Sequence, residues 1–261
     1  MDEIRVDGWA DLHEHLFGDS WKEDIGRFRS DFAFRGRDDA AEELVTSLQH
    51  LGGDVCAVER HLLRNFRRYA QLQAVPFDST WNWLALGQHH GLPTRLLDWT
   101  YSPLVALHFV TSRVERFDRD GVVWMVDYVR AQEEAPEELR AALDRDGMNV
   151  FTAESLGAVV AGLGELEESS ARDYVVFLEP PSLNERIVNQ YALFSLMSRA
   201  EARLDAWLEQ RPHLVRKVVV PAELKWEVRD KLDQANVTER VLFPGLDGLS
   251  RWLKRYYLPR A

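Results

Sequence analysis

Residues 86–110 read LGQHHGLPTRLLDWTYSPLVALHFV, and this stretch decides both the fold and the site of the chain. It places a Gln, two adjacent His, an Arg and an Asp among apolar residues that are typical of a protein core. A polar group buried among such neighbours costs roughly 1–3 kcal/mol when it lacks a hydrogen-bond partner. A sequence keeps this density of polar groups mainly where it builds a site, so we expect the functional site here.

The second half of the stretch predicts a helix over residues 103–115. Ser102 suits the position before a helix, where its hydroxyl accepts from free backbone N–H groups, and Pro103 suits the first turn. Apolar residues then recur at helical spacing as far as Val114. The N-terminus of such a helix attracts anionic groups. The polar residues that lead into it are Thr94, Arg95, Asp98 and Thr100.

Composition bounds the class of protein. The chain has 261 residues, of which 46% are hydrophobic, so it is long enough to bury a sizeable core. Its single cysteine, Cys56, excludes a disulfide framework and a zinc site made of four thiolates. The sequence shows neither an apolar leader nor a run of about 18 apolar residues, so we expect a cytoplasmic protein with no membrane partner.

The net charge of −11 argues against general binding of nucleic acid, because that affinity comes mostly from Lys and Arg. One dense basic cluster stands apart from the acidic background and offers a contact for nucleic acid or for a phosphate-bearing substrate. The alternative is a solvated helix face paired with nearby acids. The cluster consists of Arg60, Arg64, Arg67 and Arg68.

Apolar patterns predict strands over residues 28–36, 121–128, 173–179, 192–197 and 214–220. Helices are expected over residues 39–50, 56–73, 81–88, 136–145, 152–163 and 221–235, after Gly245, and in the opening segment up to Arg27. Strands that cluster late, with helices around them, indicate an α+β fold with a mixed or mainly antiparallel central sheet. We expect one domain over residues 1–261, in which residues 131–170 form a helical insertion.

Several motifs resemble the FRG domain family, which is named for its first tripeptide. The resemblance lies in residues 34–36, 83–100 and 102–107, with similar segments at residues 186–190 and 242–249. It extends from about residue 8 to about residue 255 and implies that the whole chain is a single FRG domain. The family is a weak guide to chemistry, because most of its members are described only as presumed domains.

The order of the motifs also resembles the ADP-ribosyltransferase superfamily, more distantly. In that superfamily an Arg or His on the first strand helps to hold NAD, a Ser/Thr segment before a helix frames the nicotinamide side, and a late Glu or Gln orients the ribose. The matching positions here are Arg35 with Gly36, residues 94–102, and Gln190. The resemblance implies an ADP-ribosyltransferase-like fold, NAD as co-substrate and an unknown macromolecular acceptor. By analogy it also implies an intracellular toxin or an anti-phage defence effector.

This resemblance assigns roles to particular residues. Arg35 or Arg95, with the helix N-terminus at Ser102, would neutralise the pyrophosphate, and backbone at Gly36 or Gly91 would bind the nicotinamide amide. Asp98 would stabilise positive charge on the ribose as the glycosidic bond breaks. The catalytic candidates are Arg35, His90, Asp98 and Gln190. The candidates that bind the cofactor are Arg35, Gly36, Gln88, His89, Gly91, Thr94, Arg95, Trp99, Thr100 and Ser102.

Other interpretations of the same residues stay open. His89 or His90, oriented by Asp98, would suit a general base in a nuclease. Adjacent histidines point apart on most backbones and lack a metal-binding spacing, so no metal site is expected. A buried His-Arg-Asp network also serves unique folding alone, in which case the protein is a nucleotide-binding or protein-interaction module without catalysis.

Overall fold

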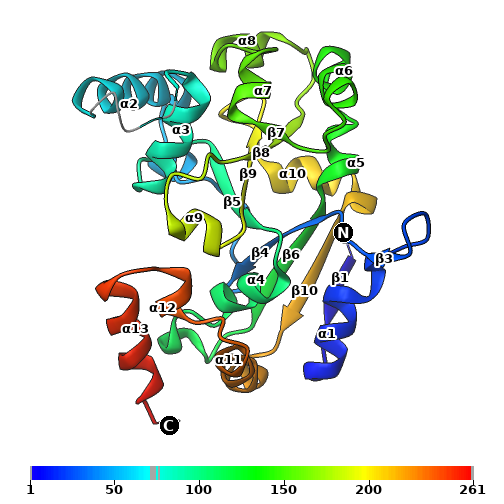
Figure 1. The fold of residues 1–261 in the computed structure, drawn as a ribbon, viewed down its shortest axis with the longest axis vertical. Coiled ribbons are helices and arrows are strands. Elements are labelled where there is room, and N and C mark those ends of the chain that lie inside the picture. Colours follow the sequence, from blue (N-terminus) through cyan, green and yellow to red (C-terminus); the bar gives the residue numbers. More distant parts are fainter. Residues whose placement is uncertain (1, 71–74, 76, 260–261) are drawn as a thin grey trace.

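The computed structural model describes residues 2–70, 75 and 77–259. In this part of the chain, eight strands form one mixed sheet in the order β1-β10-β6-β4-β5-β9-β8-β7, and β2 and β3 form a separate hairpin (Figure 1). The outer pairs β1–β10 and β7–β8 are parallel and the inner pairs are antiparallel. The predicted α+β fold with a mixed sheet is confirmed. The strands are β1 Asp2–Arg5, β2 Trp21–Lys22, β3 Arg27–Phe28, β4 Phe32–Arg37, β5 Leu96–Thr100, β6 Gly121–Asp127, β7 Phe151–Thr152, β8 Val175–Glu179, β9 Ala192–Met197 and β10 Val215–Val220.

Thirteen α-helices surround this sheet in the described residues. Short 3-10 helices connect several of them, among them η2 Gln49–Leu51, η4 Val114–Arg116 and η6 Ala222–Leu224. The α-helices are α1 Trp9–Phe17, α2 Val55–Tyr69, α3 Thr80–His89, α4 Pro103–Val110, α5 Tyr128–Gln132, α6 Glu137–Asp146, α7 Ala153–Gly157, α8 Leu163–Glu168, α9 Glu185–Asn189, α10 Leu204–Glu209, α11 Lys225–Gln234, α12 Glu239–Leu242 and α13 Leu246–Tyr256.

The sheet has a seam at its centre, between β4 and β5. β4 pairs with β6 along its whole length, and β5 pairs with β9 along its whole length. Between β4 and β5 the register contains a single pair, Phe34 with Thr100, and the two strands then diverge. Beyond that pair, side chains rather than backbone hydrogen bonds join the two halves of the sheet.

Side chains alternate across the sheet, so each strand contributes to two cores. On one face, Trp124 of β6 and Phe177 of β8 belong to one continuous cluster, which α5 and α10 cover. On the opposite face the cover is divided. Phe34 packs with α1, α4 and α11, whereas Phe194 packs with α3, α7 and α8. The seam and the division of the helical cover occur at the same place.

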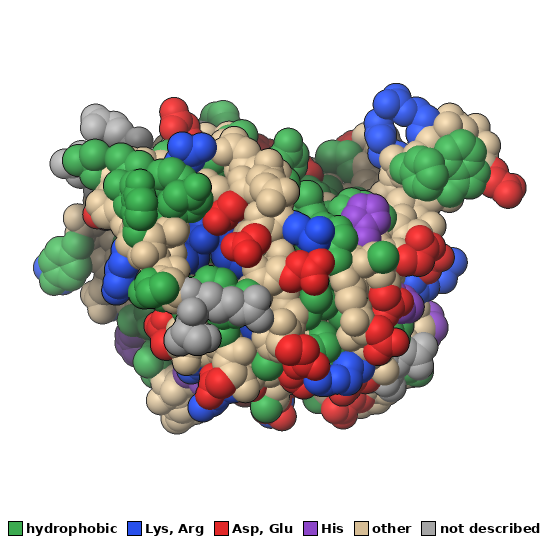
Figure 2. Space-filling view, turned by 90° about the horizontal axis from the view of Figure 1, so that it is seen from below, with side chains coloured by type: hydrophobic (Ala, Val, Ile, Leu, Met, Phe, Trp, Pro, Cys, Tyr) green, Lys and Arg blue, Asp and Glu red, His purple; other side chains and the backbone are tan. Residues whose placement is uncertain are grey.

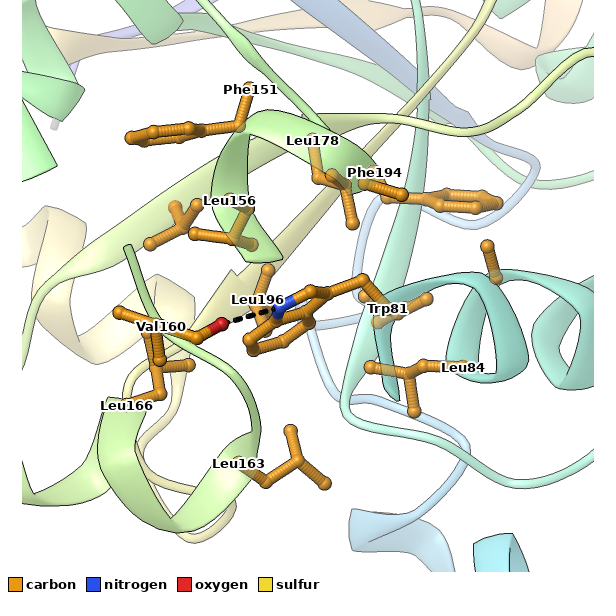
Figure 3. Close-up of a cluster of buried hydrophobic side chains, with 14 of the residues drawn as sticks. Trp81, Leu84, Phe151, Leu156, Val160, Leu163, Leu166, Leu178, Phe194 and Leu196 are labelled. Atoms are coloured by element: carbon orange, nitrogen blue, oxygen red, sulfur yellow. Dashed lines mark hydrogen bonds between the residues drawn. The ribbon is translucent and has the colours of Figure 1, made fainter. Parts of the chain in front are cut away.

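Most of residues 131–170 pack into the cluster that contains Phe194. The segment contains α6, α7 and α8, and it also supplies β7 at the edge of the sheet. The indole Nε1 of Trp81, at the start of α3, donates to the carbonyl oxygen of Val160 at 2.8 Å (Figure 3). Leu156 and Leu163 pack around the same ring. The helical insertion therefore shares its core with α3.

Several predicted boundaries need correction. Residues 39–50 do not form a helix, because their backbone bonds elsewhere: Leu48 N donates to the carbonyl of Thr94, and Ser47 Oγ accepts from Thr94 N. The opening segment is helical only as far as Phe17, and β2 and β3 follow as a hairpin that projects from the body (Figures 1 and 2).

Three further helices are shorter than predicted. α4 ends at Val110, where the Thr111 hydroxyl bonds back to the carbonyl of Leu107, and not at residue 115. α2 ends at Tyr69, and residues 71–73 of the helix predicted there lie outside the described residues. Residues 152–163 contain only the short helix α7. Across the described residues, every helix is too short or too polar to cross a membrane.

Candidate functional site

A cavity of about 270 Å³ lies at the seam, where β4, β5, the end of α3 and α9 meet. Alternate residues of β4 point to opposite faces of the sheet, yet residues 34–37 all line the cavity, so it opens along the gap between the strands. Three regions that are distant in sequence thus contribute to one cavity. Eight predicted site residues line it: Arg35, Gly36, Gln88, His89, Asp98, Trp99, Thr100 and Gln190.

Asp98 is held by a chain of side-chain hydrogen bonds. The Thr94 hydroxyl donates to Gln88 Oε1 at 2.6 Å, and Gln88 Nε2 donates to Asp98 Oδ2 at 2.9 Å. Thr94 is fully buried at the start of β5, and Gln88 lies in the last turn of α3. Side chains that are fixed in this way lose little freedom when a ligand binds. Gln88 and Thr94 therefore orient the carboxylate.

Arg35 bridges the seam. Its Nη1 donates to the backbone carbonyl of Asp98, and lies 3.9 Å from the Asp98 carboxylate. Its Nε is buried and has no hydrogen-bond partner within the described residues. Burial lowers the pKa of Arg35, although the nearby Asp98 opposes the shift. A guanidinium with an unused donor, in a place that disfavours its charge, would gain from an anion in the cavity.

Gly36 has a different role from the one expected. A Cβ at this position would lie 1.8 Å from the carbonyl oxygen of Ala106, so the backbone of α4 fills the space. The glycine lets α4 pack directly on β4, and it does not leave that space for a ligand. Gly91 also acts locally, because its φ of +80° ends α3 in the left-handed region that favours glycine.

Gln190 ties α9 to the C-terminal part of the chain. Its Nε2 donates to the carbonyl of Leu242 in α12 at 2.9 Å, and its backbone carbonyl accepts from the Thr100 hydroxyl at 2.7 Å. Gln190 Oε1 forms no hydrogen bond within the described part of the chain, so this oxygen is the atom left for a ligand. Thr100 Oγ also accepts from Ser102 N, which links β5 to the start of α4.

His89 lines the cavity with its proton position set by a neighbour. Asn184 Nδ2 lies 2.5 Å from His89 Nε2, so the amide donates and the imidazole proton sits on Nδ1. Burial lowers the pKa of His89, and the charge of Arg186 acts in the same direction, which keeps the ring neutral at pH 7. The bond from Asn184 occupies the lone pair that a general base would use.

The structure places five predicted residues outside the cavity lining. His90 is exposed at the end of α3, and Ser102 caps α4 as predicted, accepting from Val105 N. Arg95 is buried, and its Nη2 bonds Glu59 at 2.5 Å and Glu167 at 2.6 Å. Arg95 therefore serves the core. The five are His90, Gly91, Thr94, Arg95 and Ser102.

Trp99 lines the cavity, but its ring is engaged elsewhere. It is 3% exposed, and its Nε1 donates to Ser195 Oγ at 2.8 Å. The indole packs in the continuous cluster with Phe177. Tyr101, the next aromatic residue along the chain, does not line the cavity, and its hydroxyl donates to Glu179. Neither ring is free to stack on a ligand in the cavity.

Three arginines and one aspartate line the cavity, in a chain whose net charge is −11. Two of these arginines, Arg37 and Arg186, are not among the predicted site residues. Arg37 pairs with Glu42, and burial and the charge of Arg35 lower its pKa to about 10. Burial also lowers the pKa of Arg186. The surplus of positive charge makes the cavity suited to an anion.

The elements on two sides of the cavity form a recognisable unit. β4 carries the Phe-Arg-Gly tripeptide, and α3, β5 and α4 carry the long motif that follows it. Residues 30–119 match the FRG domain family. This segment is an FRG domain. The predicted resemblance is thus confirmed over this range, while its extension over residues 8–255 stays a prediction. Arg186 and Gln190 reach the cavity from outside the matched FRG residues.

Other comparisons give no match: none was found among curated proteins or among solved structures.

The basic cluster of α2 lies outside the lining of the cavity at the seam. Arg60 pairs with Glu167 at 3.2 Å and Arg67 pairs with Asp78 at 2.7 Å, so two of its four arginines have acidic partners. Contact with nucleic acid there stays a prediction. In the described residues, no group of three or more His, Cys, Asp and Glu is placed to hold a metal ion.

Proposed function

We propose that the cavity binds NAD and that the protein is an ADP-ribosyltransferase-like enzyme that cleaves the bond between nicotinamide and ribose. One observation carries this proposal: Arg35, Asp98 and Gln190 line a single cationic cavity. The arginines suit the pyrophosphate, and the carboxylate suits a sugar that becomes positively charged. The ADP-ribosyltransferase-like assignment of the fold belongs to the same proposal.

The chemistry needs little from the protein beyond orientation and charge. As the bond from the ribose C1′ to nicotinamide breaks, nicotinamide leaves with the electron pair and positive charge develops on the ribose. Asp98, fixed by Gln88, would stabilise that charge, and Gln190 Oε1 would accept from a ribose hydroxyl. Water or an acceptor nucleophile then bonds to C1′ and loses its proton to solvent.

The test is release of nicotinamide from NAD labelled in its nicotinamide ring, measured with and without cell lysate. We expect Asp98→Asn to lower the rate by about 10²–10³-fold, because a stabilising charge is lost while the side chain keeps its size. Release without lysate would identify a glycohydrolase. Transfer of label to lysate protein from NAD labelled in its adenine ring would identify a transferase.

Arg145→Ala is the control, because Arg145 is exposed on α6 and, within the described residues, pairs only with its neighbour Asp146. It should leave the rate unchanged. If NAD neither binds in calorimetry nor loses nicotinamide, the proposal is wrong, and a protein-interaction role for the FRG domain stands in its place. Degradation of RNA or DNA that persists without NAD would instead favour the nuclease.

A further inference from the structure

A second cavity of about 420 Å³ adjoins the first. It lies between α4 with η4 on one side and α12 with α13 on the other. Its apolar walls include Phe109, Phe243 and Leu258. Its charged lining has four cations, Arg113, Arg251, Lys254 and Arg255, against two carboxylates, Glu115 and Glu239. The site proposed above does not use this cavity.

Two aromatic rings lie where the two cavities adjoin each other. Phe109 lines both of them, and its ring centroid lies 6.4 Å from that of Phe243. The guanidinium of Arg186, which lines the first cavity, lies 5.1 Å from the centroid of Phe243. The guanidinium of Arg251, which lines the second, lies 5.6 Å from the same centroid. The two cations thus lie close to one ring, one cation from each cavity, at most about 11 Å apart.

Three of the cations that line the two cavities form no salt bridge within the described residues. Arg113 pairs with Asp38, and Arg255 pairs with Glu239. Within the described residues, by contrast, neither Arg186, Arg251 nor Lys254 forms a salt bridge. Burial lowers the pKa of Arg186; the charge of Asp98 opposes this shift and the charge of Arg251 adds to it, as expected for like charges near each other. In a chain with more acidic than basic residues, this arrangement favours a multiply charged anion.

The size of the first cavity also indicates that a ligand would extend beyond it. At about 270 Å³ it lies just below the range of roughly 300–1,000 Å³ for ligand pockets, so it suits one half of a dinucleotide. The second cavity has space and aromatic walls for another ring system, and aromatic side chains stack well on nucleobases.

We propose that the two cavities form one bipartite site for a dinucleotide, whose ring systems occupy separate cavities and whose pyrophosphate lies over Phe243 between Arg186 and Arg251. The proposal rests on the proposed function, because NAD belongs to this class of ligand. It assigns the nicotinamide half to the cavity that contains Asp98 and the adenosine half to the cavity between α4 and α13.

Calorimetry with NAD, nicotinamide mononucleotide and AMP tests the assignment. On the unmodified chain, we expect the two mononucleotides to bind together without displacing each other. Ser112→Glu places a carboxylate in the second cavity, and it should abolish AMP binding and reduce NAD affinity to that of nicotinamide mononucleotide alone. Arg251→Ala should weaken NAD binding by about 10–100-fold, as expected for the loss of a charge-assisted hydrogen bond.

Arg240→Ala is the matched control for Arg251→Ala. Arg240 also lies over an aromatic ring, Trp252, but lines neither cavity, so NAD affinity should stay within about 2-fold of the unmodified chain. The bipartite site is wrong if AMP competes with nicotinamide mononucleotide. It is also wrong if NAD is bound and cleaved normally in Ser112→Glu and Arg251→Ala, a result that leaves the proposed function standing. Absence of all NAD binding would overturn both.

Discussion

Gly36 is the residue at which α4 lies against β4 with no space for a side chain. Gly36→Ala would bring Cβ to 1.8 Å from a backbone oxygen of α4, which no rotamer change relieves. We expect a loss of about 2–4 kcal/mol in the free energy of unfolding, measured by urea denaturation. Gly164→Ala is the control, since a Cβ there meets nothing within 4 Å, and it should change stability by less than about 1 kcal/mol. Equal effects of the two substitutions would contradict this packing.

His108 gives the fold a dependence on pH. Burial lowers its pKa to about 3, and the charge of Arg229, whose Nη1 lies 2.9 Å from His108 Nδ1, acts in the same direction, while Glu239 opposes it. In the unfolded chain the imidazole takes up a proton below its ordinary pKa near 6.5, whereas the folded chain does not. Stability should therefore fall as pH drops from 6.5 towards 3, by up to about 1.4 kcal/mol per pH unit.

Urea denaturation at pH 7, 6 and 5 measures this slope. His108→Gln keeps an acceptor for Arg229 but does not titrate, so its free energy of unfolding should change less between pH 6.5 and 5 than that of the unmodified chain. Arg255 also faces this histidine and keeps its charge over the whole range, so it does not confuse the comparison. Parallel pH profiles for the two chains would show that His108 is not the source.

At the scale of elements, a buried ion cluster joins α2 to the start of β5. Arg95 and Glu59 are each no more than 3% exposed, and Arg95 also bonds Glu167 and the carbonyl of Ser198. Arg95→Leu would leave the Glu59 carboxylate buried without a cation, at a cost of about 3–5 kcal/mol. The double substitution Arg95→Leu with Glu59→Leu should recover most of that loss, as a double-mutant cycle would measure. A double variant as unstable as the single one would show that packing, not charge, holds the elements together.

The elements that sequence predicts best are the buried strands. β6 and β8 are mainly apolar and contain several valines, β9 is apolar apart from Ser195, and β10 combines four valines with Arg216 and Lys217; each strand lies where it is expected. β5 is less visible, because Asp98 and Thr100 interrupt its pattern for the sake of the cavity. In residues 39–50, by contrast, the apolar pattern predicts a helix that the structure does not contain. Leu44 and Leu48 have helical spacing and are buried, but Leu48 N donates to the distant carbonyl of Thr94 instead of to a carbonyl one helical turn earlier.

Some residues of the candidate site could also be predicted from the sequence, and others could not. Arg35, Asp98 and Gln190 stand out in the sequence, because polar groups among apolar neighbours and the FRG motif mark them. Arg186, Phe243 and Arg251 are not marked as site residues by their local sequence, and only the packing of α9, α12 and α13 brings them to the cavities. The family resemblance at residues 186–190 and 242–249 is the signal that covers the first two.

For the whole molecule, the seam predicts uneven protection of the central sheet. β6 is paired on both sides, whereas β5 is paired fully only with β9. Hydrogen exchange followed by mass spectrometry should therefore be faster over residues 96–100 than over residues 121–127. Saturating NAD should slow exchange at residues 96–100 more than at residues 121–127. Equal protection of the two strands in the free protein would mean that the halves of the sheet are joined more tightly than their register indicates.

The walls of the two cavities are synthesised at widely separated times. Phe109 leaves the ribosome long before Phe243, which lies 134 positions later. At 5–20 residues per second, roughly 7–27 s pass between the two. During that interval Phe109 is present without Phe243, so the side of Phe109 that α12 and α13 later cover would be exposed. A growing chain would thus complete the walls of the second cavity only once residues 239–258 have been synthesised, and a chaperone that recognises exposed aromatic groups would have this patch available until then.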